Sequence, residues 1–224
     1  PRRKDVELYV RNFDIYPDIY NSKNIRYLDV GKLYRKLDRP NMFEGLRATK
    51  QGLRYVDKWI KANNINKPIV AITIRNYGYD KVRNSNLDAW SRFSTYLDGS
   101  GYFPVIIPDI DGDYVDQTYF TDGYIYKEAA WNMMLRMALY ERVYLNFFVT
   151  GGPLTLAFMN PKTSYIAMNA LPEGSVITTK EAYKKIRYDI GTNYKFSTKN
   201  QKLVYDTDSY ENILSEFECY VNKC

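Results

Sequence analysis

The stretch Pro68-Ile69-Val70-Ala71-Ile72-Thr73-Ile74-Arg75 decides the fold class, because it is a nearly unbroken run of apolar and β-branched residues. A strand that faces water on one side alternates polar and apolar residues, and this run has no such alternation. It is typical of a strand buried on both faces of a parallel sheet. Residues 68–74 therefore predict an inner strand that ends just before Arg75.

Regular patterns continue on both sides of this run. Further buried strands are predicted over residues 102–107, 143–149 and 164–168, with a short extended piece at 202–205. Helices are predicted over residues 44–62, 85–97, 127–140, 178–187 and 209–221, with a short one after residue 153. Strands that alternate with helices indicate βαβ units. The sequence therefore predicts an α/β fold, a Rossmann-like parallel sheet flanked by helices.

The domain organisation follows from where this regularity begins. Residues 1–43 mix short apolar runs with Asn, Asp and Pro, and we interpret them as an N-terminal arm or the remnant of an upstream domain. Residues 44–224 are predicted to form one Rossmann-like domain. No stretch approaches the roughly 20 apolar residues that span a bilayer, and we do not expect the charged residues 1–10 to be a signal peptide.

Composition limits the chemistry of the protein. The 224 residues contain no histidine, which excludes a Ser-His-Asp triad, a Cys-His pair and His-ligated zinc. The two cysteines, Cys219 and Cys224, give no disulfide framework, so we expect a reducing, cytoplasmic compartment. A net charge of +6 is compatible with nucleic-acid binding, but the basic residues are dispersed and no recognition motif occurs. We therefore expect no nucleic-acid partner.

The segment after the first strand is the first candidate site. Its polar residues are Arg75, Arg83, Asn84, Ser85 and Asn86. Ser85 with Asp88 three residues later matches a helix capping pattern. Two arginines beside a helix start favour an anion site, since forked donors, free amides and the helix dipole combine there. The alternative is a surface loop whose arginines pair with carboxylates such as Asp80.

The third strand is followed by Gly151, Gly152 and Pro153 at the start of a short helix. Glycines let the backbone approach a ligand closely, and proline suits the first helical position. Such a turn is structural as often as functional. Neither G-x-G-x-x-G nor a Walker A loop occurs.

The second strand is followed by Asp109, Asp111 and Asp113 at alternate positions. Such carboxylates suit a hard cation, but the glycine and the terminal ligand of a calcium loop do not fit the pattern. We therefore expect no metal cofactor. Asp109, nearest the strand end, is the candidate ligand contact or general base, and a solvated Asp-Gly turn is the alternative.

Over residues 44–220 the chain resembles a group of bacterial glycosyltransferase-like proteins. The segments that carry the resemblance are Ile72–Arg75, Arg83–Asn86, Trp90, Phe93, Val105–Asp109, Arg136–Glu141, Asn146, Gly151–Pro153 and Gln201–Asp208. The layout is similar to the nucleotide-sugar-binding half of a GT-B enzyme. An arginine after the first strand is also similar to that of fucosyltransferases, where it holds the donor diphosphate.

The resemblance implies a glycosyltransferase-like function, in which the sugar of a nucleotide-diphosphate donor is transferred to a saccharide acceptor. Arg75 and Arg83 would neutralise the diphosphate with help from the amides of Gly151 and Gly152. Asp109 or Glu141 would contact the ribose or act as base. A GT-B enzyme has two such halves, whereas 224 residues hold only one half and an arm. Many fucosyltransferases also carry a histidine near the arginine, whereas this sequence contains no histidine. This departure keeps open a non-catalytic nucleotide- or glycan-binding module that works with an upstream domain or as a homo-oligomer.

Overall fold

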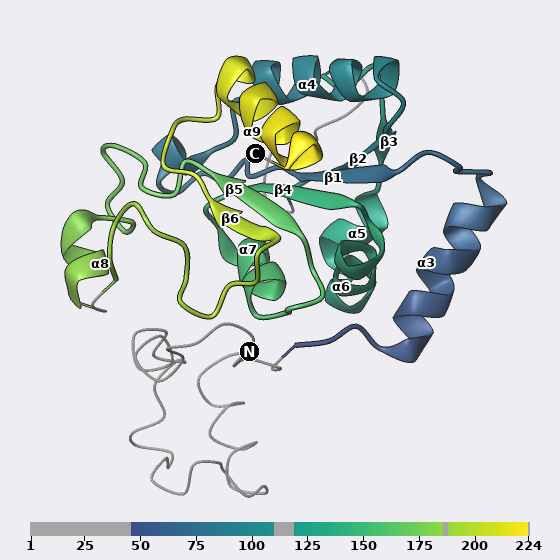
Figure 1. Cartoon of the computed structure of the whole chain (residues 1–224), viewed down its shortest axis with the longest axis horizontal. Helices are drawn as coiled ribbons and strands as arrows, with labels where there is room; N and C mark the ends of the chain where they lie inside the picture. Colours follow the sequence, from purple (N-terminus) through teal and green to yellow (C-terminus); the bar gives the residue numbers. More distant parts are fainter. Residues whose placement is uncertain (1–45, 110–118, 186–187, 224) are drawn as a thin grey trace, which may run out of the picture.

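The computed structural model describes residues 46–109, 119–185 and 188–223, and a sheet of six parallel strands runs through them (Figure 1). The strands are β1 (Ile69–Thr73), β2 (Phe103–Ile107), β3 (Tyr124–Ile125), β4 (Leu145–Val149), β5 (Tyr165–Met168) and β6 (Gln201–Leu203). Their order across the sheet is β3-β2-β1-β4-β5-β6. The predicted α/β fold with a Rossmann-like parallel sheet is thus confirmed.

The order of the strands reverses at β1. The chain places β2 and β3 on one side of β1 and then returns to place β4 on the other. Thr73, the last residue of β1, aligns with Ile107 of β2 and with Phe148 of β4. In open α/β sheets ligands bind beyond the carboxyl ends of the strands at such a reversal. The segments that follow Thr73 and Val149 therefore flank the place where a ligand is expected.

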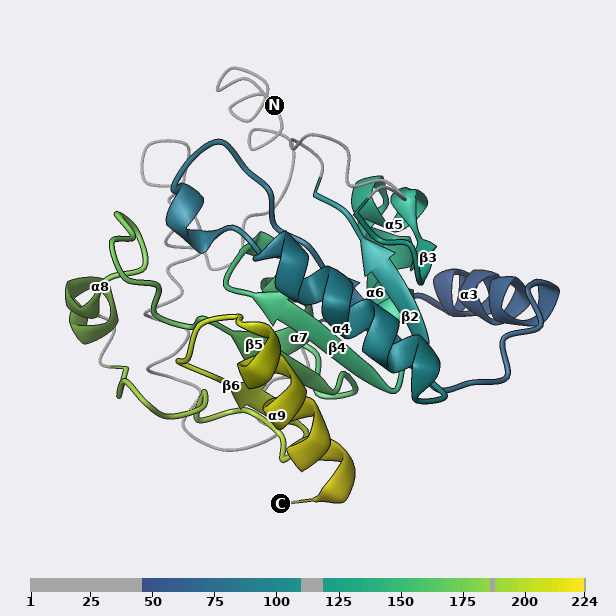
Figure 2. The same ribbon diagram turned by 90° about the horizontal axis from the view of Figure 1, so that it is seen from above.

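Helices cover both faces of the sheet. They are α3 (Lys50–Ala62), the 3₁₀ turn η1 (Lys81–Arg83), α4 (Leu87–Gly99), α5 (Lys127–Trp131), α6 (Met133–Arg142), α7 (Gly152–Phe158), α8 (Lys180–Lys185) and α9 (Tyr210–Asn222). Helices α4 and α9 lie side by side over one face, and α5, α6 and α7 cover the other (Figures 1 and 2). Because both faces are covered, every residue of β1 and β4 is buried.

The two faces of the sheet support two apolar cores, because successive strand residues point to opposite sides. Ala71 belongs to the core under α6 and α7, and its neighbour Ile72 to the core under α4 and α9. In the second core the ring of Phe93 meets Phe147 and Phe217 edge to face, with centroids 5.1 and 5.4 Å apart. Each such pair adds about 0.5–1.5 kcal/mol beyond its buried area. The aromatic residues thus fix α4 and α9 on the sheet.

Three predicted elements differ from the structure. The helix predicted over 44–62 begins at Lys50, where the Thr49 hydroxyl accepts a hydrogen bond from the Gly52 amide. The helix predicted over 127–140 is two helices, because Asn132 Oδ1 accepts hydrogen bonds from the Met134 and Leu135 amides and starts a new helix. Strand β3 lies within the loop predicted over 108–126.

The predicted N-terminal arm, residues 1–43, lies outside the described residues, so the division of the chain at residue 43 stays a prediction. Within the described ranges, no helix is long and apolar enough to cross a membrane.

The segment after β6 is fastened to the start of α4 by Asp208. Asp208 is 5% exposed, and its Oδ2 accepts hydrogen bonds from the Asn86 amide and from Trp90 Nε1, both at 2.8 Å. A buried donor that loses its only acceptor costs stability.

We expect Asp208→Ala to lower the free energy of unfolding by about 1–3 kcal/mol, because it leaves the indole N–H of buried Trp90 without its acceptor and removes the hydrogen bond to the Asn86 amide. Urea denaturation measures the change. Asp206→Ala, an exposed residue of the same segment, is the matched control and should have little effect. Equal losses in the two variants would contradict this role of Asp208.

Candidate functional site

The carboxyl ends of β1 and β4 open into a crevice of about 260 Å³ where the strand order reverses. It is lined by Thr73, Ile74, Arg75, Tyr77, Arg83, Asp109, Phe148, Val149, Gly151, Gly152 and Pro153. Six of these residues were predicted as site residues from three separate segments: Arg75, Arg83, Asp109, Gly151, Gly152 and Pro153. The parallel topology therefore gathers most of the predicted site at one place.

Side chains close the loop between β1 and α4 on itself. The Ser85 hydroxyl accepts a hydrogen bond from the Arg75 amide, and the Ser85 amide donates one to the Arg75 carbonyl, both at 2.9 Å. Asn84 brackets Tyr77: its Oδ1 accepts from the Tyr77 amide and its Nδ2 donates to the Tyr77 carbonyl, both at 3.1 Å. Asn84 and Ser85 thus shape the loop and do not line the crevice.

The backbone amides at the start of α4 are hydrogen-bonded to side chains of the protein itself. The predicted cap, Ser85, was wrong: Asn86 is the N-cap, and its side chain accepts from the Ala89 amide at 3.3 Å. The carboxylate of Asp208 bonds the Asn86 amide at this same helix end. Asn86 is therefore a structural cap, and it does not line the crevice.

The guanidinium of Arg75 is held by neutral acceptors of its own loop. Nη1 donates to Asn84 Oδ1 and, at 3.3 Å, to the Asp80 carbonyl, and Nη2 donates to the Tyr79 carbonyl at 2.9 Å. The guanidinium carbon lies 5.8 Å from the centre of the Tyr77 ring. These contacts orient the charge of Arg75 without a hydrogen bond to a carboxylate among those described here.

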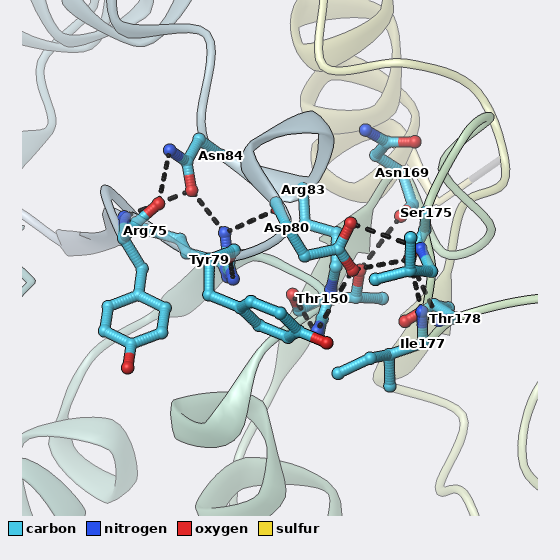
Figure 3. A network of polar contacts seen from close by, with 12 residues as sticks. Arg75, Tyr79, Asp80, Arg83, Asn84, Thr150, Asn169, Ser175, Ile177 and Thr178 are labelled. Carbon is cyan, nitrogen blue, oxygen red and sulfur yellow. Dashed lines mark hydrogen bonds and ion pairs between the residues drawn. The ribbon is translucent and has the colours of Figure 1, made fainter.

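Arg83 and Asp80 connect the loop between β1 and α4, which we call the arginine loop, to the segments after β4 and before α8 (Figure 3). Arg83 Nη2 donates to the Thr150 carbonyl after β4 at 3.1 Å, and Nη1 lies 3.8 Å from Asp80 Oδ2. The Asp80 carboxylate, 2% exposed, accepts from the Ser175 hydroxyl at 2.7 Å and from the Val176 amide at 3.3 Å. Arg83 is thereby fixed between the end of β4 and the loop that precedes α8.

The electrostatics of the crevice favour a bound anion. Burial lowers the pKa of Arg75, and the positive charge of Arg83 lowers it further. Asp109, Asp80 and Tyr77 act in the opposite direction and do not reverse the shift. Two partly buried guanidinium groups that repel one another gain more from an added negative charge than exposed ones do.

The start of α7 forms the other wall of the crevice. Pro153 is the second residue of α7, one position after the predicted first one, and Gly151 precedes the helix with extended backbone. A Cβ on Gly151 would lie 3.5 Å from Arg75 Cδ, which is an ordinary contact, and a Cβ on Gly152 would meet nothing within 4 Å. The fold therefore tolerates a side chain at Gly152, and the open space beside it is available to a ligand.

The two predicted carboxylates have separate places. Asp109 lines the crevice, and its Oδ2 accepts a hydrogen bond from the Asn76 amide at 3.0 Å. The structure does not bring Glu141 to the crevice: its carboxylate accepts hydrogen bonds from the Ala48 amide and from Asn160 Nδ2, both at 2.7 Å. Glu141 lies near the end of α6, which leads back to the amino end of β4, so it is at the opposite edge of the sheet.

Several residues of the site were not predicted. Tyr77 lies in the loop between β1 and α4, and its place beside Gly78 just after a strand was the available signal in the sequence. Thr73 lines the crevice and hydrogen-bonds to the hydroxyl of buried Tyr140 at 2.9 Å. Ser175 binds Asp80 across 95 residues of sequence, and nothing local in the sequence indicates that contact.

Within the described ranges, no group of three or more acidic or cysteine side chains is arranged to hold a metal ion, and the absence of a metal cofactor stays a prediction. The alternating carboxylates Asp111 and Asp113 lie outside the described residues.

A larger groove of about 540 Å³ lies at the opposite edge of the sheet, beside α9. Its walls include the ion pair between Lys202 and Glu216, with Nζ 2.6 Å from Oε2. None of the predicted site residues lines it. The smaller crevice is the better candidate, because two arginines and the strand-order reversal coincide there.

The Asp80 link predicts a pH dependence of stability. Burial alone would raise the pKa of the Asp80 carboxyl, but hydrogen bonds from Ser175 and Val176 and the charges of Arg83 and Arg75 outweigh it and lower the pKa. A lowered pKa stabilises the fold above the ordinary carboxyl value, near 3.9, and that stabilisation disappears as the pH falls through the folded-state pKa.

We therefore expect Asp80→Asn to be less stable than the wild type at pH 7, and the difference to shrink as the pH falls below about 4. Urea denaturation across pH 3–7 tests this expectation. Asp98→Asn, which breaks an exposed pair with Lys67, is the control and should change little. A difference that stays constant with pH would contradict a charged role for Asp80.

Comparison with known proteins finds neither a matching family model nor a matching curated protein. Among solved structures, the fold is similar to that of a glycosyl transferase family 9 protein from Veillonella parvula, with a TM-score of 0.55 and 11% sequence identity. The similarity covers 81% of this chain and 55% of that one, so the chain spans about half the length of its structural neighbour. The chain thus has a glycosyltransferase-like fold.

Proposed function

We propose that the crevice binds the diphosphate of a nucleotide-sugar donor, and that the protein transfers the sugar to a saccharide acceptor. The observation that carries this proposal is the convergence of Arg75 and Arg83 on one crevice that the backbone of Gly151 and Gly152 also lines. The similarity in fold to a glycosyl transferase supports it.

The chemistry suits a site without histidine. Sugar transfer breaks the bond between the anomeric carbon and a diphosphate oxygen, so negative charge accumulates on the leaving diphosphate. Fixed positive charges and backbone amides that stabilise this charge accelerate the reaction without proton transfer to the leaving group. Arg75 and Arg83 supply the positive charge, and their loop contacts hold them in place before a ligand binds.

Binding requires Arg75 to exchange partners. Its guanidinium now donates to loop carbonyls and to Asn84. Phosphate oxygens are charged acceptors, and hydrogen bonds between charged groups are about twice as strong as neutral ones. A diphosphate in the crevice can therefore replace these acceptors, and the resemblance of Arg75 to the arginine that holds the donor diphosphate in fucosyltransferases is in line with this exchange.

Asp109 is the carboxylate of the crevice that is suited to a hydroxyl. Its Oδ2 accepts a hydrogen bond from the Asn76 amide, and this bond fixes the orientation of the carboxylate. We assign it the contact to the ribose or the role of base toward the acceptor hydroxyl.

The second candidate function is nucleotide or glycan binding without transfer, alone or with another domain or copy. The hydrogen bonds of the Arg75 guanidinium to carbonyls of its own loop favour this second candidate, because they stabilise the loop when no substrate is bound. Release of a nucleoside diphosphate from its sugar in the presence of saccharide acceptors distinguishes the two candidates.

We expect Arg75→Ala and Arg83→Ala each to weaken nucleoside-diphosphate binding by about 10- to 100-fold, because each removes charge-assisted hydrogen bonds. Titration calorimetry with a panel of nucleoside diphosphates and their sugars measures it. Arg92→Ala on α4, where the guanidinium lies over the Tyr210 ring, is the matched control and should bind as the wild type does. Unchanged affinity in both site variants would refute the proposal.

Gly152→Ala separates binding from stability. The added methyl group meets nothing within 4 Å in the protein, so stability should stay the same or rise by up to about 1 kcal/mol. A diphosphate that approaches the backbone at the start of α7 would meet the methyl group and bind more weakly. Calorimetry and thermal unfolding on the same sample report the two effects. Full affinity in this variant would place the ligand elsewhere.

A further inference from the structure

The mouth of the crevice holds an exposed aromatic ring that the diphosphate contacts do not use. Tyr77 lines the crevice, yet 41% of it is exposed. Single exposed aromatic side chains are common on protein surfaces, so the position of Tyr77 on the wall of the crevice, and not its exposure alone, makes it available to a ligand.

The backbone of Tyr77 is held in place before any ligand binds. Its amide donates to Asn84 Oδ1, and its carbonyl accepts from Asn84 Nδ2. Ser85 closes the same loop through two bonds with Arg75. A ring on a fixed backbone loses little conformational freedom on contact with a ligand, so the contact retains more of its free energy.

The ring of Tyr77 lies beside the charge to which we assign the phosphate. The guanidinium carbon of Arg75 lies 5.8 Å from the ring centre, so the phosphate-binding charge and the aromatic ring are adjacent. A ligand that places an anionic group at Arg75 therefore places the group next to that anion near Tyr77. Nucleobases stack on aromatic side chains whatever their sequence identity, because every base has a flat π-face.

The size of the crevice points the same way. Its 260 Å³ lies below the range of roughly 300–1,000 Å³ for sites that enclose a whole small-molecule ligand. A diphosphate fits within such a space, and a nucleoside attached to it would extend out of the crevice past its lining, which includes Tyr77.

From these observations we infer that Tyr77 stacks on the base of the bound nucleotide, and that the crevice recognises nucleoside diphosphates in preference to inorganic or sugar phosphates. This inference rests on the proposed function, because it takes the diphosphate to lie at Arg75 and Arg83. Tyr77 would determine ligand specificity, because it contacts the base and not the bond between the sugar and the diphosphate that breaks during transfer.

The test compares pyrophosphate with ADP, GDP and UDP by calorimetry, on the wild type and on three variants. We expect at least one nucleoside diphosphate to bind the wild type about tenfold more tightly than pyrophosphate, as base stacking on an aromatic side chain provides. Tyr77→Ala should lose this gain and keep the affinity for pyrophosphate, which also reports a folded site. Tyr77→Phe should keep the gain, because stacking does not need the hydroxyl.

Tyr79→Ala is the matched control. Tyr79 is on the same loop and more exposed, it does not line the crevice, and the carbonyl that Arg75 binds is retained in the variant. It should bind all four ligands as the wild type does. Should Tyr77→Ala lower the melting temperature, Tyr77→Leu, which keeps apolar bulk without a flat ring, takes its place and should also lose the gain.

The outcomes separate this inference from the proposed function. If the wild type binds pyrophosphate and no nucleoside diphosphate more tightly, stacking is overturned and the anion site stands. If Tyr77→Ala weakens all ligands equally, Tyr77 acts only through Arg75, and the inference is again overturned. Loss of the gain in Tyr77→Phe would assign it to the hydroxyl and overturn stacking. If the wild type binds none of the four ligands, both proposals fail.

Discussion

The parallel pairing of β1 with both β2 and β4 is the constraint on which the candidate site depends. It aligns Thr73 with the last residue of β2 and the penultimate residue of β4, so three chain segments leave the sheet at one edge. Arg75, Asp109 and Gly151 come from these segments and meet at one crevice although they are far apart in the sequence. A helix-covered sheet without the reversal at β1 would place the same residues apart. The topology therefore creates the site before any single side chain does.

Charge is the second element of the site, and the protein compensates it only in part. A partly buried cation needs acceptors, and the arginine loop gives Arg75 neutral ones, the carbonyls of Tyr79 and Asp80. Arg83 lies within 3.8 Å of the Asp80 carboxylate, but that carboxylate also serves Ser175. The lowered pKa of Arg75, due first to burial and then to Arg83, reflects this incomplete compensation. The loop is thus stable without a ligand and still gains from an anion.

Local sequence patterns predicted the central strand and the residues that follow it, but they could not predict contacts between residues far apart in the sequence. The run of apolar and β-branched residues at 69–73 predicted β1, because a strand buried on both faces has such residues at every position. Arg75 and Gly151 were predicted as site residues because they directly follow strands. Strand β3 has only two residues and carries no periodic signal. Glu141 was misplaced because a helix position does not say which edge of the sheet it reaches, and the bond between Asp80 and Ser175 depends on tertiary structure alone.

The two helices that begin at this edge of the sheet differ in a way that orients the site. The start of α4 already has a negative partner, the buried carboxylate of Asp208, which bonds the Asn86 amide. The start of α7 is preceded by Gly151, and Gly152 has open space where a side chain would stand. The carboxylate at the start of α4 repels an incoming anion, so an anion is expected at the arginines and the open space beside Gly152, away from α4. The phosphate end of a ligand is therefore expected on the β4 side of the crevice. The rest of it then extends toward the loop after β1, where Tyr77 lies.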